Sequence, residues 1–354
     1  MSHFCRIKAF VNIERKANSF CLTNTTPLFE KFVRKVKNEY IKFHKERDPS
    51  MMILEKALDS TNEKCYDETL MENKAFNDSF QQIRTDKELP FSIMQEVYCS
   101  KLNPSNVVSF PTQHLLKTCY FIKSNLSKEV FYKIQRQHKI WWMKYGASPG
   151  KYTISDLKNE SHFKYVNIKF ESEDLALDVE RLKLLSLKNV SKENFVLNNF
   201  LFREANKKRD IIPDVIETTV DLHIASLALL LDAVNFSSEY IALHRRSAPY
   251  QLALIISEAS NDLIDLARYI ELLILNTEPE IDILNDAVKI TVNKQSLNER
   301  LENFDQIGIP YSIILDKTSL DEGFLKLRNR NTTLNETIHL SDVTKYLINI
   351  FKSP

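Results

Sequence analysis

The last third of this chain alternates between short β-branched segments and longer segments with helical spacing, and this alternation constrains the fold more than any other feature. Strands are expected at residues 251–257, 288–292, 310–315 and 323–330, and helices at residues 262–275, 297–306 and 341–351. Such alternation implies a mixed sheet with helices packed on its faces. Gly308 and Gly323 precede expected strands, where tight turns need glycine, and Ser341 is expected to start the last helix. We therefore expect an α/β domain over residues 241–354.

The residues before this domain indicate a larger α+β domain over residues 27–240. From the spacing of apolar residues, helices are expected at residues 29–43, 128–145 and 223–234, and strands at residues 106–122, 163–170 and 211–220. Residues 50–105 are mostly polar, and for them we expect one or two weakly patterned helices with loops. A chain of 354 residues is long enough for two ordinary cores, which agrees with this division.

Composition excludes several classes of protein. The formal net charge is +1, so any nucleic-acid contact must come from a local basic patch. No apolar run approaches the roughly 20 residues that span a bilayer. Only four glycines occur, with none between Gly150 and Gly308, and neither a P-loop nor a Rossmann fingerprint is present. The five cysteines lack a C-x-x-C pair and the eight histidines lack an H-E-x-x-H spacing, so we expect free thiols in a reducing compartment, no metal site and no cofactor.

Residues 1–26 have the composition of a mitochondrial presequence. They contain four cations against a single acid, Glu14, and apolar residues with the spacing of one helical face. The cations are Arg6, Lys8, Arg15 and Lys16, and the apolar residues are Phe4, Ile7, Phe10 and Val11. Presequences are basic and amphipathic. A disordered basic N-terminus is the alternative interpretation of the same residues.

Three segments carry a resemblance to a known family. They are Leu243-His-Arg-Arg-Ser-Ala-Pro-Tyr-Gln251, the strand and turn from Gly323 to Thr333 with Ile338 to Ser341, and Lys139-Ile-Trp-Trp-Met-Lys-Tyr-Gly-Ala-Ser-Pro149. In order and spacing these segments resemble the accessory subunits of mitochondrial DNA polymerase gamma. The last domain of that family is similar to the anticodon-binding domain of class II aminoacyl-tRNA synthetases. The resemblance covers residues 105–354, and it covers residues 27–104 by position only.

The resemblance implies a first domain like a class II synthetase core, with an antiparallel sheet. The glycine-rich ATP motif of such cores is missing here, so we expect no catalysis. The implied role is that of a processivity subunit in the mitochondrial nucleoid, which binds the catalytic subunit of the polymerase and primer-template DNA. The short region before Ser109 leaves little room for the helical hairpin through which longer members dimerise. We therefore expect a heterodimer with one catalytic subunit, and homodimerisation is in doubt.

Candidate contact residues follow from the motifs and from charge. For the polymerase they are Gly323, Arg328, Arg330 and Thr332, because the planar fork of arginine suits an interface. An edge strand with solvated arginines is the alternative. For DNA they are Lys207, Lys208 and Arg209 in a polar turn, Lys133, Arg136 and Lys139 on one helix face, and Arg245 and Arg246. Clusters of this kind neutralise phosphates and release counterions.

Trp141 and Trp142 are candidates to stack on exposed bases, with a core position for at least one of them as the alternative. Two other functions remain open at this point. One is a degenerate class II synthetase paralogue that binds tRNA through the same C-terminal domain. The other is a nucleoid protein that coats mitochondrial DNA without a polymerase partner, which the near-neutral net charge disfavours.

Overall fold

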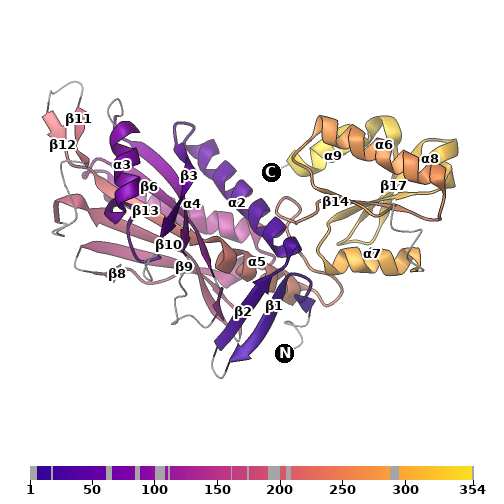
Figure 1. Cartoon of the computed structure of the whole chain (residues 1–354), viewed down its shortest axis with the longest axis horizontal. Helices are drawn as coiled ribbons and strands as arrows, with labels where there is room; N and C mark the ends of the chain where they lie inside the picture. The colour runs from indigo at the N-terminus through magenta and orange to yellow at the C-terminus, as the bar shows by residue number, and fades with distance from the viewer. Residues whose placement is uncertain are drawn as a thin grey trace.

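The computed structural model divides into two units that lie side by side along the long axis of the molecule (Figure 1). The structure describes residues 6–16, 19–60, 66–83, 88–99, 108–110, 112–160, 162–173, 175–189, 200–204, 209–287 and 295–352. No helix within these ranges is long and apolar enough to cross a membrane.

An eight-stranded sheet forms the centre of the first unit. Its strand order is β3 (Met52–Ser60), β4 (Phe91–Cys99), β6 (Gln113–Ile122), β13 (Asp214–Asp221), β10 (Ala176–Ser186), β9 (Phe163–Glu171) and β7 (Tyr152–Ile154), and the short β8 (Lys158–Asn159) also pairs with β9. The pairs from β4 to β7 are antiparallel, but β3 runs parallel to β4. The sheet therefore departs from the expected antiparallel arrangement at its β3 edge.

Helices cover one face of this sheet. They are α2 (Pro27–Arg47), α4 (Ser127–Tyr145) and α5 (Leu222–Phe236), as the spacing of apolar residues predicts. Thr26 caps α2 by accepting a hydrogen bond from the backbone amide of Phe29, Pro27 occupies the first turn, and Asp48 ends the helix. The other face packs against α3 (Lys74–Ile83) and the hairpin of β11 (Phe202–Glu204) and β12 (Arg209–Ile211), with Phe76, Phe80 and Phe202 in a shared apolar cluster.

The structure corrects two expectations near the N-terminus. Residues 50–105 contain the strands β3 and β4 besides α3 and the short helix η1 (Leu70–Glu72), so the expectation of helices and loops alone is wrong. The strands β1 (Val11–Lys16) and β2 (Ser19–Thr25) join β5 (Val108–Ser109) in a small sheet, so these residues do not continue an amphipathic helix. Ile7, Phe10 and Val11 are completely buried, so part of the expected presequence belongs to the core.

The second unit contains the expected mixed sheet. Its order is β15 (Ile283–Asn285), β14 (Leu252–Ile256), β16 (Tyr311–Leu315), β17 (Phe324–Asn329) and β18 (Asn335–His339). β14 is parallel to β15 and β16, whereas β16, β17 and β18 are antiparallel to one another. Gly308 and Gly323 have φ angles of 79° and 75°, which confirms their place in tight turns. The strand expected at 288–292 lies outside the described residues.

Helices lie on both faces of this second sheet (Figure 1). α6 (Asn261–Thr277) and α9 (Val343–Lys352) share one apolar cluster with the sheet, with α8 (Lys317–Asp321) beside α6, and α7 (Leu297–Gln306) packs in a separate cluster. The last helix follows a short helix, η7 (Leu340–Asp342), which is capped by His339, so Ser341 is not the capping residue that the sequence suggests. Among the cysteines, Cys119 is a buried free thiol, but Cys99 is disulfide-bonded, which contradicts the expectation of free thiols throughout.

Candidate functional site

The exposed side of α4 carries a run of cations. Lys133 and Arg136 are exposed and Lys139 is half-buried, and Lys128 and Lys144 extend the run at either end of the helix. Glu129 is the one acidic residue in α4. Within the described part of the chain, none of these five cations takes part in an ion pair. We refer to these five residues as the α4 basic face; it brings the three expected cations of this helix together on one surface.

Both tryptophans lie on the opposite, buried side of α4. Trp141 is 4% exposed and Trp142 is fully buried, so the suggestion that they stack on bases is wrong. The Trp142 indole donates a hydrogen bond of 2.7 Å to the carboxylate of Glu180 on β10. The same carboxylate lies 2.7 Å from the Tyr40 hydroxyl, which donates to it, and 2.6 Å from Nδ1 of His138. This buried network fixes α4 against α2 and the sheet, and it thereby holds the α4 basic face toward solvent.

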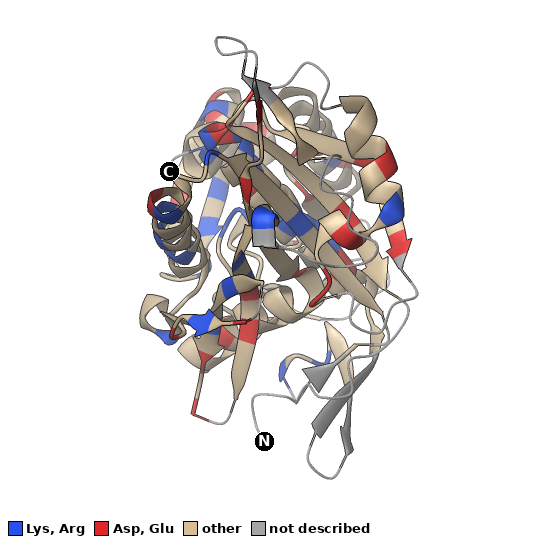
Figure 2. Ribbon diagram, turned by 90° about the vertical axis from the view of Figure 1, so that its left-hand side faces the viewer, with Lys and Arg blue, Asp and Glu red and all other residues tan. Residues whose placement is uncertain are grey.

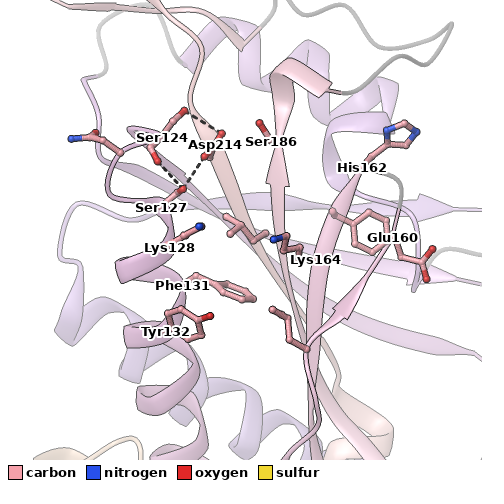
Figure 3. Close-up of a pocket in the computed structure, with 14 residues that line it drawn as sticks. Ser124, Ser127, Lys128, Phe131, Tyr132, Glu160, His162, Lys164, Ser186 and Asp214 are labelled. Carbon is pink, nitrogen blue, oxygen red and sulfur yellow. Dashed lines mark hydrogen bonds between the residues drawn. The ribbon is translucent and has the colours of Figure 1, made fainter.

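A groove of about 450 Å³ opens at the N-terminal end of α4 (Figure 3). Asp214, at the start of β13, accepts hydrogen bonds from the hydroxyls of Ser127 (2.8 Å) and Ser124 (3.2 Å). Figure 3 places the Lys128 side chain on the helix side of this groove and Lys164, from β9, on the sheet side. Phe131 and Tyr132 also line it, and Tyr132 is 58% exposed. The sequence had no signal for this groove because its walls come from segments far apart in the chain.

The other two groups of DNA candidates lie outside α4. Lys207 and Lys208 lie outside the described residues, and Arg209 belongs to β12, where its side chain is not described. Arg246 is bonded to Glu39 of α2 at 2.8 Å, and its side chain is only 14% exposed. Arg245 is half-buried and lines a cavity of about 270 Å³ between the two units. Arg246 is thus paired within the chain, and phosphate contacts at Arg245 and Arg246 remain a prediction.

His244 lies in the same junction. Its ring packs on Tyr145 with a centroid distance of 4.6 Å. Burial, followed by the charges of Arg245, Arg246 and Lys144, lowers the pKa of His244 to about 4. The ring is therefore neutral at physiological pH, and its packing on Tyr145 gives the histidine of the Leu-His-Arg-Arg motif a structural role.

Arg330 is an internal bridge. It is 3% exposed, and its guanidinium donates to the carbonyl oxygens of Gly308 (2.8 Å) and Leu243 (3.0 Å). Burial lowers the pKa of Arg330 to about 10. Arg328 binds both carboxylate oxygens of Asp305, at 2.9 and 2.8 Å, and its side chain is 11% exposed. This burial contradicts the expectation that Arg328 and Arg330 face a partner, because their donors already have acceptors inside the chain.

A second junction that the sequence did not suggest links α2 to the loop before β15. Nζ of Lys31 and Nζ of Lys35 lie 2.7 and 2.6 Å from the carboxylate oxygens of Asp282. Lys35 also donates to the side chain of Gln251 at 3.0 Å. Burial alone would raise the pKa of Asp282, but the bonds from the two lysines hold it below its usual value. Two lysines four residues apart on a helix are common on solvated surfaces, so the sequence gives no sign of their ion pairs with Asp282. Only the tertiary structure reveals this contact.

Gly323 and Thr332 flank the exposed edge of the second sheet. Thr332 is exposed, and Gly323 is half-buried directly before β17. In the described part of the sheet β18 pairs with β17 alone, so its other side is open. Three exposed apolar side chains lie at the two ends of this β17–β18 hairpin: Leu320 (40% exposed) and Phe324 (40%) at the end of Gly323, and Leu334 (69%) at the end of Thr332. We call these five residues the β18 edge surface, and an open strand with exposed apolar residues is suited to protein binding.

The face of the first sheet opposite α2 carries buried charges, but segment 66–72 covers them. Lys183 donates to the carbonyl of Asp67 and Lys117 to the carbonyl of Glu68, while Glu217 accepts a 2.7 Å bond from the Leu70 amide. Burial lowers the pKa of Lys183 to about 8. Among the described residues no group of three or more His, Cys, Asp or Glu side chains could hold a metal. Lys117, Lys183 and one oxygen of Glu217 are thus bonded by the chain itself, whereas the second oxygen of Glu217 has no hydrogen-bond partner among the described residues.

Acidic and basic residues are interspersed over both units, in agreement with the formal net charge of +1 (Figure 2). The α4 basic face is therefore a local feature, as the composition requires for any contact with a polyanion.

Comparison with known proteins identifies the relatives of this chain. Residues 282–350 match the family model "Anticodon binding domain". The chain is 31% identical over 301 residues to "DNA polymerase subunit gamma-2, mitochondrial" of Drosophila melanogaster, which covers 80% of this chain and 81% of that protein. It is 21% identical to "DNA polymerase subunit gamma-2" of Mus musculus, of which it covers 61%.

A more distant similarity extends to a tRNA ligase. The chain is 26% identical over 157 residues to "Glycine--tRNA ligase" of Borreliella afzelii, covering 42% of this chain and 33% of that protein. The similarity to the Drosophila protein is higher and extends through both structural units. The chain belongs to the family of DNA polymerase gamma subunit 2.

Proposed function

We propose that this protein is the accessory subunit of a mitochondrial DNA polymerase gamma, and that it acts in the mitochondrial nucleoid as a processivity factor. The observation that carries this proposal is the 31% identity to the Drosophila subunit over 80% of the chain. The subunit holds the catalytic chain in a productive state and adds positive surface along the primer-template. Processivity then rises because dissociation slows, and about 1.4 kcal/mol of added binding prolongs residence roughly tenfold.

The α4 basic face is the proposed contact with DNA. Its cations lie along one helix and have no ion-pair partner among the described residues, so each is available to a phosphate. Phosphate contacts of this kind are independent of sequence and weaken with salt, with a slope of about −0.9 per neutralised phosphate in a double-logarithmic plot. Lys207, Lys208 and Arg209 remain a second proposed contact.

Removal of charge from α4 tests this contact. In a variant with Lys133, Arg136 and Lys139 changed to Gln, we expect weaker duplex binding and a salt slope that is smaller by about 2–3. The matched control removes the same charge from the second unit by changing Arg268, Lys317 and Lys345 to Gln, all of which are exposed. Equal losses in the two variants would indicate that net charge, and not the α4 basic face, determines the affinity.

The β18 edge surface is the proposed contact with the catalytic subunit. It retains Gly323 and Thr332 from the sequence-based candidates and replaces the buried Arg328 and Arg330 with Leu320, Phe324 and Leu334. Leu334→Asp is expected to weaken capture of the catalytic chain by tenfold or more, about 1.4 kcal/mol, because a charge would be desolvated in the interface. Leu272→Asp, at a residue of α6 that is 61% exposed, is the control. An effect of Leu272→Asp alone would move the interface to α6.

We further propose that the subunit has no active site of its own and forms a heterodimer with one catalytic chain. Support comes from segment 66–72, which covers this face of the first sheet and bonds Lys117, Lys183 and Glu217 through the backbone of Asp67, Glu68 and Leu70. Titration with ATP and with amino acids, followed by thermal unfolding, tests the first statement, since a ligand that binds the folded state raises the unfolding temperature. Sedimentation of the mixed subunits tests the second.

The decisive experiment measures primer extension by the matching catalytic chain, with and without this protein, over a salt series. Longer products and greater salt tolerance are expected. Unchanged product length in the presence of folded protein would refute the accessory role.

A second candidate, tRNA binding, is favoured by the match of residues 282–350 to the anticodon-binding model and by the similarity to a glycine–tRNA ligase. Gel-shift competition between primer-template DNA and tRNA separates the two candidates. If tRNA displaces the DNA by a wide margin at equal concentration, tRNA binding becomes the preferred function.

A further inference from the structure

The groove at the N-terminal end of α4 combines an exposed aromatic ring with two cations. Tyr132 is 58% exposed and lines the groove beside Phe131. Lys128 and Lys164 are both exposed and, among the described residues, neither is in an ion pair. Figure 3 shows their amino groups on opposite sides of the groove, one on α4 and one on the sheet. An exposed aromatic ring beside two available cations is an arrangement that proteins use to hold an unpaired base and its phosphates.

The volume of the groove indicates whether a DNA duplex or a single nucleotide could occupy it. Its volume of about 450 Å³ lies in the range of sites for small ligands, about 300–1,000 Å³, and is far too small for a double helix. In a duplex the faces of the bases are covered by their neighbours, so a tyrosine could not stack on them. Only an unpaired nucleotide can use both the ring and the groove.

The remaining polar groups leave the interior of the groove suited to a base. The carboxylate of Asp214 is already bonded to the hydroxyls of Ser124 and Ser127. Glu160 adds one negative charge and His162 also lines the wall. A carboxylate repels phosphate but accepts hydrogen bonds from the amino groups of bases. The two lysines at the sides thus suit the backbone, whereas the carboxylate and hydroxyl groups suit the edge of a base.

The groove is continuous with the α4 basic face. Lys128 belongs to both, and Tyr132 is followed directly by Lys133. At 1.5 Å per residue, the eleven-residue step from Lys128 to Lys139 spans roughly 16 Å, which corresponds to about five base pairs of duplex. A duplex that contacts the cations of α4 would therefore present an unpaired end to the groove.

We propose that this groove binds an unpaired nucleotide of DNA next to a duplex held by the α4 basic face, with its base stacked on Tyr132 and its flanking phosphates paired with Lys128 and Lys164. This inference rests on the proposed function, because it requires that the protein bind primer-template DNA. It adds a preference for a junction between double-stranded and single-stranded DNA over a blunt duplex.

The test compares the affinity of the full chain for a blunt DNA duplex with its affinity for the same duplex carrying a short unpaired extension. The wild type is expected to bind the extended DNA more tightly. Tyr132→Ala should reduce that binding by about five- to a hundredfold, as the loss of one stacked base predicts, and should leave blunt-duplex binding unchanged. Tyr132→Phe should retain the preference. Tyr269→Ala, at a tyrosine of α6 that is 55% exposed, is the matched control and should have no effect.

The outcomes distinguish this inference from the proposed function. If the wild type binds both DNAs equally and Tyr132→Ala changes neither affinity, the groove is not a nucleotide site, although duplex binding and the accessory role stand. If Tyr132→Ala weakens both DNAs to the same extent, Tyr132 contacts the duplex and the proposal is overturned. If the wild type binds neither DNA, the inference and the proposed DNA contact fail together.

Discussion

Replacement of Arg330 by methionine tests whether this residue holds the two units together or contacts a partner. Arg330 donates to the carbonyl oxygens of Gly308 and Leu243, and Leu243 belongs to the segment that joins the units. The guanidinium also bonds the side chain of Asn331 at 3.2 and 3.1 Å. Methionine preserves the apolar stem but donates no hydrogen bond, so the two carbonyl groups would lose this donor.

Two opposing effects determine the magnitude. The pKa of Arg330 falls from 12.5 to about 10 through burial, and the charged guanidinium therefore costs about 3 kcal/mol in the folded state. Each hydrogen bond from a charged donor contributes about 1.5–3 kcal/mol, and bonds to three groups are lost. The bonds outweigh the cost of burial. We expect Arg330→Met to lower the free energy of unfolding by about 2–6 kcal/mol.

The assay is urea unfolding followed by far-ultraviolet circular dichroism, because both tryptophans lie in the first unit and their fluorescence would not report on the second. Proteolysis of the joining segment, residues 237–251, gives an independent measure of how firmly the units are held. Lys326→Met is the control, since Lys326 lies on β17, which ends directly before Arg330, has a side chain that is 49% exposed and pairs with Asp316 at the surface. It should change stability by less than about 1 kcal/mol.

The reasoning would be refuted by an Arg330→Met protein with the stability and protease resistance of the wild type. If that protein also failed to capture the catalytic chain, Arg330 would be a contact residue, as its sequence motif suggested. A destabilised variant that still binds the catalytic chain at low temperature would support the internal role.

Three further predictions follow from the structure. Glu180→Ala leaves Tyr40, His138 and Trp142 without their shared acceptor, so it should lower the free energy of unfolding by about 3–5 kcal/mol in urea unfolding monitored by tryptophan fluorescence. Glu171→Ala, at an exposed residue of the neighbouring strand, is the control and should not have this effect. A loss below about 1 kcal/mol for Glu180→Ala would contradict the importance of the network. The pKa of His244 is lowered from 6.5 to about 4 in the folded chain. Between these two pH values the unfolded chain binds a proton that the folded chain does not, so the free energy of unfolding should fall as the pH drops from 6.5 towards 4. His244→Gln should flatten this part of the plot of stability against pH, and an unchanged plot would refute the burial of a neutral His244. Deletion of residues 1–11 removes Ile7, Phe10 and Val11 from the core and should lower the free energy of unfolding by at least about 4 kcal/mol. N-terminal sequencing of the mitochondrial protein should therefore find a start before Arg6. A stable protein that starts at residue 27 would instead support cleavage of the whole expected presequence.

Much of the fold follows from local patterns. The helices at 27–47 and 127–145 were predictable because their apolar residues recur with helical spacing, and the mixed sheet of the second unit because its strands alternate with helices. The strands β3 and β4 were missed. β4 is buried on both faces, Gln95 included, so it lacks the alternation of apolar and polar residues that marks a half-exposed strand.

The candidate site, like the fold, could be predicted from the sequence only in part. Helical spacing alone predicts that Lys133, Arg136 and Lys139 share one face, because residues three apart are neighbours on a helix. Nothing in the local sequence distinguishes the exposed Arg136 from the buried Arg330, since whether an arginine is solvated depends on which carbonyl groups surround it after folding.

The sequence by itself determined the two units, the main helices, the family motifs and the lack of a nucleotide-binding glycine loop, because these depend on residues close together in the chain. The tertiary structure alone decided that Arg330 joins the units, that the tryptophans are buried, and that Lys128, Tyr132 and Lys164 meet in one groove. Each of these facts depends on contacts between residues that are far apart in sequence, and such contacts are set by the packing of whole helices and sheets.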